Sequence, residues 1–332
     1  MSNGQGGRLT KNERREQARE EMRRKMEAAR RKERTGKVLL QGGIILAVVA
    51  VAVVVALVII NSVGPKGPGP RNMASGGVLF QPGAAGEVQV AKTAGLADEA
   101  ERVMADSRAE LQVQVFVDFL CPLCGRFERG ITPEEFQASG FPGTAADYTG
   151  NADYIKTLIK EGVASLEVVP VAILDRYSLG TKYSTRAANA FACVVDQEPG
   201  IAMDYMGLLF EQQPDEGTSG LDDNELIALA RDAGSSSAAT ELCIRNQSFK
   251  SFIADNTNTA SSKAEFANLV ADDAYTGPIG TPVVYVNGKR FTPEYDWSNN
   301  ASFRTFIQQL LGEEYQESQP QPTPTPTSTP TP

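Results

Sequence analysis

The 332-residue sequence contains no histidine. A Ser-His-Asp triad, a Cys-His dyad, a haem held by histidine and a zinc site with histidine ligands are therefore all excluded. Aromatic residues are scarce at 7%, and there are four cysteines. Any chemistry must come from these cysteines, from carboxylates, lysines and hydroxyl groups, or from the backbone.

One long stretch has no polar side chain, because residues 42–60 are all Gly, Ala, Val, Leu or Ile. At about 1.5 Å of rise per residue, this run makes a helix of roughly 30 Å, the thickness of the hydrocarbon core of a bilayer. We predict a single transmembrane helix at 38–60. The alternatives are a buried core helix, which is rarely apolar on every face, and a cleaved signal peptide, whose charged and apolar parts are usually shorter.

The charge of the chain changes sign at this run. Residues before it carry +7 (13 Lys/Arg and 6 Asp/Glu) and the rest carry −16 (19 and 35), which gives the total of −9. Because Lys and Arg stay on the cytoplasmic side of a span, residues 1–37 are predicted to be cytoplasmic and the chain after the span extracytoplasmic, anchored in the cell membrane. All four cysteines would then lie where disulfides persist.

Composition divides the exported part into three regions. Residues 61–75 are rich in Gly and Pro and are predicted to be a linker. Residues 314–332 alternate Pro with Thr, Gln and Ser, which predicts a disordered tail, with a glycosylated stalk as the alternative. The globular domain is predicted at 76–313. Its acidity argues against a nucleic-acid partner, as do the glutamates interleaved in the basic segment.

Within the domain, the apolar pattern changes between strand and helix periods. Strands are predicted at 112–119, at 166–174 with Pro170 marking an edge or an interruption, and at 281–286 with 289–291 as a hairpin partner. Helices are predicted at 185–196, 201–210, 223–233, 238–246 and 302–311, the last ending at Gly312.

A Cys-x-x-Cys motif, Cys121 to Cys124, directly follows the first of these strands. Such a pair is a redox centre, half of a metal site, or two incidental thiols. A zinc site would need Cys193 and Cys243, which stand singly in helical segments, so no metal is expected. A helix can begin at Pro122, and its free N–H groups would stabilise a thiolate. Cys121 is then the exposed nucleophile and Cys124 the buried resolving thiol.

Two segments, 116–124 and 280–289, resemble the two signatures of the DsbA-like branch of the thioredoxin superfamily. A third, 183–193, is similar to the inserted helical domain of its membrane-tethered actinobacterial members. The resemblance implies a thioredoxin-like α/β fold over the whole domain, with a helical subdomain inserted at about 178–275.

The resemblance also implies an activity: an extracytoplasmic thiol:disulfide oxidoreductase that forms disulfides in exported proteins. Its substrates would be exported proteins with cysteines, and a membrane redox partner would recycle the Cys pair. Pro282 would be cis and, with Thr281 beside it, would hold the substrate. No cofactor is implied, because the electrons reside in the disulfide.

Several alternatives stay open. Pro122 and Leu123 stand where many oxidases of the family carry a histidine, so an isomerase or reductase of the same fold is a second interpretation. A tethered peptide-binding module with a non-catalytic Cys pair is a third, from a different class. Asp118 either assists proton transfer near Cys124 or caps the helix after it.

Cys193 and Cys243 give the simplest pairing for the two remaining thiols. A structural disulfide between them would stabilise the fold by roughly 4 kcal/mol on the chain-entropy model. Two buried free thiols are the alternative.

Overall fold

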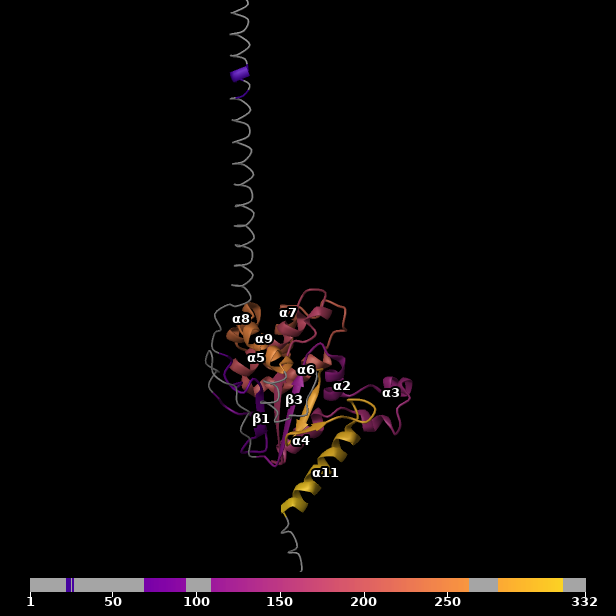
Figure 1. The fold of residues 1–332 in the computed structure, drawn as a ribbon. Coiled ribbons are helices and arrows are strands. Elements are labelled where there is room, and N and C mark those ends of the chain that lie inside the picture. The colour runs from indigo at the N-terminus through magenta and orange to yellow at the C-terminus, as the bar shows by residue number, and fades with distance from the viewer. Residues whose placement is uncertain (1–21, 25, 27–68, 94–108, 263–279, 319–332) are drawn as a thin grey trace, which may run out of the picture. The chain divides into compact units, whose positions relative to one another are not determined.

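The computed structural model describes residues 22–24, 26, 69–93, 109–262 and 280–318 (Figure 1). The chain divides into two compact units, 1–65 and 66–332. In the first unit the described residues are helical. The second unit contains all of the sheet and the helices discussed below.

The centre of the second unit is a six-stranded mixed sheet with the strand order β2-β1-β4-β3-β5-β6. Strands β3 and β4 are parallel, and every other neighbouring pair is antiparallel. Both central strands are buried along nearly their whole length, which explains their almost continuous apolar sequence. The strands are β1 Val78–Pro82, β2 Val88–Val90, β3 Leu111–Val117, β4 Ala164–Pro170, β5 Val283–Val286 and β6 Lys289–Phe291.

Pro170 ends a strand but does not mark an edge. It is the last residue of β4, and β4 lies between β1 and β3 in the interior of the sheet. Of the two alternatives predicted for Pro170, the edge is wrong and the interruption is confirmed, because the strand predicted at 166–174 ends at Pro170. The proline is tolerated because it lies at the end of the ladder, opposite Val117, where a missing N–H breaks no further pairing.

Helices flank the sheet and fill the long connection between β4 and β5. They are α2 Pro122–Arg129, α3 Pro133–Ser139, α4 Ala152–Lys160, α5 Tyr183–Gln197, α6 Ala202–Glu211, α7 Asp223–Asp232, α8 Ala238–Asn246, α9 Lys250–Ser261 and α11 Asn300–Ser318. The predicted end of the last helix at Gly312 is wrong, since α11 continues to Ser318. A glycine inside a helix costs only about 1 kcal/mol and does not by itself end it.

Helices α5 to α9 form the helical block inserted between β4 and β5 (Figure 1). Helix α5 is its centre, is buried along most of its length, and contacts α6, α7, α8 and α9. A disulfide between Cys193 and Cys243 joins α5 to α8. The disulfide and the buried face of α5 hold the block together as one layer.

The ordered domain begins earlier and ends later than the composition predicts. Met73 is buried, and Arg71 pairs with the Asp196 carboxylate at 3.1 Å, so residues 69–75 belong to the domain and not to a free linker. Residues 314–318, predicted to belong to the disordered tail, lie in α11. The rest of the predicted linker and tail lies outside the described residues.

The described residues include no helix long and apolar enough to cross a membrane. The transmembrane helix predicted at 38–60 lies outside them, as does nearly all of the predicted cytoplasmic segment 1–37.

Candidate active site

The Cys pair lies where β3 passes into α2. Cys121 is the N-cap residue of α2, with an extended backbone (φ −71°, ψ 116°), and Pro122 is the first helical residue. Proline suits this position because the N–H it lacks would have no partner inside the helix. The Cys121 carbonyl accepts the N–H groups of Cys124 at 3.0 Å and Gly125 at 3.2 Å. Cys121 therefore lies at the positive end of the helix dipole.

Both thiols of the pair are free and buried. Cys121 is 6% exposed and Cys124 is 1% exposed. The prediction that Cys121 is exposed is wrong, because a distant segment covers it: its thiol donates a hydrogen bond to the carbonyl oxygen of Thr281, with 3.1 Å between the two atoms.

The two thiols differ in acidity. A hydrogen bond from Cys124 lowers the pKa of Cys121 to about 7 in spite of burial, and the side chain of Thr281 contributes in the same direction. Burial, followed by the neighbouring Cys121, raises the pKa of Cys124 well above its ordinary value. Because the thiolate is the nucleophile, the sulfur that reacts near neutral pH is that of Cys121.

The pairing of β5 with β3 brings Thr281 and Pro282 close to the Cys pair. The peptide bond between them is cis, and both residues immediately precede β5. Strand β5 runs antiparallel to β3 with Val283 opposite Phe116, which places Thr281 beside the end of β3. The structure therefore brings Cys121, Thr281 and Pro282 together.

Asp118 is fully buried in the turn between β3 and α2. Its carboxylate accepts the N–H groups of Leu120 at 2.9 Å and Leu174 at 2.8 Å. The alternative that it caps the helix is wrong, because the N-cap position belongs to Cys121. Burial raises the pKa of Asp118 to about 6 despite its hydrogen bonds, and the backbone of Asp118 bonds the Cys124 sulfur.

Sequence reasoning missed Gln213, which follows α6 in the helical block. Its side-chain Nε2 donates to the carbonyl oxygens of Phe119 and Cys121, each at 3.0 Å. A lone glutamine in a loop has no pattern that could have revealed this contact, since the two carbonyls lie more than 90 positions earlier in the chain.

Cys193 and Cys243 are bonded to each other, with Cα atoms 5.8 Å apart. Their sulfurs are thus engaged in a disulfide and are not free ligands for a metal. Over the described ranges, acidic and cysteine side chains form no cluster of three or more that could hold a metal ion.

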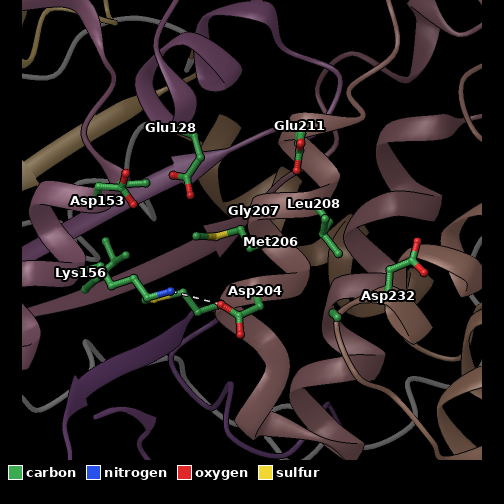
Figure 2. Close-up of a pocket in the computed structure, with 13 residues that line it drawn as sticks. Glu128, Asp153, Lys156, Asp204, Met206, Gly207, Leu208, Glu211 and Asp232 are labelled. Atoms are coloured by element: carbon green, nitrogen blue, oxygen red, sulfur yellow. Dashed lines mark hydrogen bonds and ion pairs between the residues drawn. The ribbon is translucent and has the colours of Figure 1, made fainter. Parts of the chain in front are cut away.

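A separate cavity of about 450 Å³ lies between α2, α4, α6 and α7. Its walls carry more acidic than basic groups, and its one described ion pair joins Lys156 to Asp204 at 3.2 Å (Figure 2). Burial, with the neighbouring Asp153 charge, raises the pKa of Glu128 to about 7. The lining residues are Glu128, Ala152, Asp153, Lys156, Leu166, Met203, Asp204, Met206, Gly207, Leu208, Glu211, Asp232 and Ala233.

Comparison with known proteins gives one family match. The thioredoxin family model matches residues 149–309, which include Thr281 and Pro282 and begin after the Cys pair. No curated protein sequence matches the chain.

Solved structures similar to this chain include a disulfide bond oxidoreductase (DsbG), DsbA and the thiol-disulfide oxidoreductase MdbA. Reduced DsbG from Mycobacterium tuberculosis is 24% identical, with 64% of this chain and 85% of that chain covered and a TM-score of 0.43. Oxidised DsbA from the same organism is 24% identical, with 71% and 93% covered and a TM-score of 0.43. MdbA from Corynebacterium matruchotii is 16% identical, with 69% and 90% covered and a TM-score of 0.41.

The family match and the mixed sheet show a thioredoxin-like fold, in which the free Cys pair lies at the start of α2. The resemblance to the thioredoxin superfamily that the motifs indicate is confirmed.

Proposed function

We propose that this protein is an extracytoplasmic oxidase that forms disulfides in exported proteins. The observation that carries the proposal is the asymmetry of the Cys pair. Cys121, at a helix N-terminus and 3.1 Å from the Thr281 carbonyl, has a pKa of about 7, whereas the pKa of buried Cys124 is raised well above the ordinary value. A stable Cys121 thiolate favours the dithiol form and hence the donation of a disulfide.

The reaction begins with the Cys pair as a disulfide. A substrate thiolate attacks the Cys121 sulfur, the Cys121–Cys124 bond breaks, and Cys124 leaves and takes up a proton. A second substrate thiolate then attacks the substrate sulfur of the mixed disulfide and releases Cys121 as a thiolate. Two electrons have passed from the substrate dithiol to the Cys pair. The low pKa of Cys121 makes it the better leaving group in the second step.

Asp118 is the proposed proton donor to Cys124. Its carboxyl group is buried, its pKa is about 6, and its own backbone bonds the Cys124 sulfur. A carboxyl group that titrates near the working pH can both give and regain a proton.

Thr281 and Pro282 are the proposed substrate-binding residues, because they adjoin the sulfur that the substrate must attack. Leu123, between the two cysteines, is 39% exposed and offers an apolar contact at the same place. A client could contact the Thr281–Pro282 segment with its backbone and Leu123 with any apolar side chain. Neither contact requires a particular sequence, which suits an enzyme with many clients.

The location is part of the proposal. The apolar run at 42–60 and the basic residues before it support a single-pass anchor with the catalytic domain outside the cytoplasm. A membrane redox partner would return the dithiol to the disulfide. Protease treatment of sealed vesicles from cells that make the full chain tests this topology, since the domain should be digested only from the extracytoplasmic side.

The direction of exchange is tested by the reduction potential of the Cys pair in the full chain, equilibrated with glutathione buffers. The double variant Cys121→Ala/Cys124→Ala is the control for the other two cysteines. A potential well above the thioredoxin value of about −270 mV is expected. A value at or below it would replace the oxidase by a reductase or isomerase.

A trapping experiment separates an exchange enzyme from a binding module. With Cys124→Ala, the Cys121 thiolate should attack the disulfide of an oxidised client, displace one client thiolate and remain joined to the other sulfur, because the resolving thiol is absent; reductant should release the client. Cys121→Ala should trap nothing and lose turnover. Retained function in Cys121→Ala would show that the Cys pair is not catalytic.

A further inference from the structure

The side chain of Gln213 connects the helical block to the turn that carries Cys121. Gln213 lies just after α6, and its Nε2 is 3.0 Å from the carbonyl oxygen of Phe119 and 3.0 Å from that of Cys121. An amide NH₂ group has two hydrogens, so it can serve both acceptors at once. The two bonds span the turn from one side of Cys121.

The Cys121 carbonyl that Gln213 holds is also the first acceptor of α2. It receives the N–H groups of Cys124 at 3.0 Å and Gly125 at 3.2 Å. Those first-turn N–H groups matter for the thiol, because the backbone of Leu123 and Cys124 helps to lower the pKa of Cys121. The orientation of the Cys121 peptide and the donors around its sulfur are therefore linked.

Gly125 makes room for this contact. A Cβ atom built at Gly125 would lie 2.3 Å from Oε1 of Gln213, closer than real Cβ atoms come to another atom, and 3.2 Å from its Cδ, which is a tight contact. Gly125 lies inside α2, where alanine would favour the helix. Its lack of a side chain is thus explained by the space that the Gln213 amide occupies.

The helical block also contacts the 119–121 turn at a second point, the side chain of Phe119. The Phe119 ring contacts the rings of Phe191 in α5 and Phe210 in α6, with centroids 5.5 Å and 5.1 Å apart. The rings anchor the turn by packing, which is tolerant of small rotations of the peptide planes. The Gln213 amide, in contrast, bonds both carbonyl oxygens directly and so ties their directions to each other.

We propose that Gln213 is a positioning residue for the nucleophile: its two hydrogen bonds fix the 119–121 turn so that the N–H groups of the first turn of α2 face the Cys121 sulfur. The helical block is then part of the active site and not only a covering layer. The inference rests on the proposed function only in taking Cys121 as the reacting thiol.

The experiment measures the pH dependence of Cys121 alkylation by iodoacetamide in the reduced full chain, with the modified cysteine identified by mass spectrometry. In Gln213→Ala we expect the midpoint to rise by about half to one pH unit, and the rate at pH 6 to fall by roughly three- to tenfold, as the thiolate fraction falls. Gln212→Ala is the matched control, because its side chain is exposed and adjacent in sequence. It should leave the profile unchanged.

Gly125→Ala is a second way to break the hydrogen bonds between the Gln213 amide and the turn. The new methyl group should displace the Gln213 amide while keeping the helix, so this variant should shift the profile as Gln213→Ala does. Because both changes remove one interaction, the double variant should add nothing to either single one. Additive shifts, or an unchanged profile in Gly125→Ala, would overturn the proposal. If Gln213→Ala does not fold, Gly125→Ala still decides.

The readout needs no substrate and so is independent of turnover. If the parent chain does not oxidise clients but both variants shift the alkylation profile, the proposed oxidase is wrong and the role of Gln213 stands. If the parent chain oxidises clients and neither variant shifts the profile, the oxidase stands and the role of Gln213 is wrong.

Discussion

The thiol of Cys121 donates a hydrogen bond to the carbonyl of Thr281 across 3.1 Å, although 160 positions separate the two residues. The contact exists because β5 pairs with β3, while the whole helical block is looped out between them. The buried nucleophile is thereby controlled by a segment near the other end of the domain. Substitutions at Thr281 should therefore change the acidity and the reactivity of the Cys121 thiol.

Removing the Thr281 hydroxyl should make Cys121 less acidic. The Thr281 side chain lowers the pKa of Cys121, so Thr281→Ala is expected to raise that pKa and slow alkylation at pH 6 by about threefold. Thr281→Ser keeps the hydroxyl and should behave like the parent chain. Equal rates in both variants would show that the backbone carbonyl alone matters.

Asp118 should make the protein more stable in mild acid. Burial raises its pKa in the folded protein from the ordinary value of 3.8 to about 6, so its contribution is complete below pH 4 and is lost as the pH rises through 6. We expect the free energy of unfolding to fall by about 3 kcal/mol over this range for this group. Denaturant unfolding of Asp118→Asn should lack that slope.

The matched control is Asp215→Asn, at an exposed position. It should keep the slope. The proposed proton transfer adds a second test: turnover by Asp118→Asn should lose an inflection near pH 6 that the parent chain and the control show. An inflection that persists would assign it to another group.

The ionised form of Glu128 should destabilise the folded protein above neutral pH. Its pKa is raised from 4.5 to about 7 by burial and by Asp153, so the stability present below pH 4.5 is lost as the pH rises through 7. Glu128→Gln keeps the neutral form and should be more stable than the parent at pH 8 by about 1 kcal/mol. The two should be alike at pH 4, and exposed Glu216→Gln should show no such gain.

The Cys193–Cys243 disulfide should be structural. It closes a loop over 50 positions, for which the chain-entropy model gives a loss of about 4 kcal/mol when both cysteines are replaced by alanine. Denaturant unfolding of the double variant measures this loss. The Cys121 alkylation profile of the folded variant should be unchanged, and a shift would show that the disulfide also shapes the active site.

Local patterns in the sequence predict much of the fold. The period of the apolar residues predicts α5 to α8 to within two residues of their ends, and the Asn287-Gly288 turn predicts the β5–β6 hairpin. Strands β1 and β2, which span five and three residues, are not predicted. Their place in the sheet depends on pairing with β4 and with each other.

The site also has parts that the sequence predicts and parts that it does not. The strand, Cys pair and Pro122 are contiguous, so the start of α2 can be read directly from the sequence. The burial of Cys121 and the contact with Gln213 cannot, because each depends on a segment more than 90 positions away. The role of Asp118 is ambiguous in sequence for a related reason: its partner Leu174 is supplied by the chain after β4.

The disulfide between α5 and α8 also bears on how the chain matures. Its cysteines leave the ribosome in the order Cys121, Cys124, Cys193, Cys243, and four cysteines allow three complete pairings. The native bond joins the last two, and the remaining two form the exchange pair. Oxidation of neighbours in order of emergence therefore gives the native arrangement at once, and the chain needs no reshuffling of mispaired cysteines to reach it.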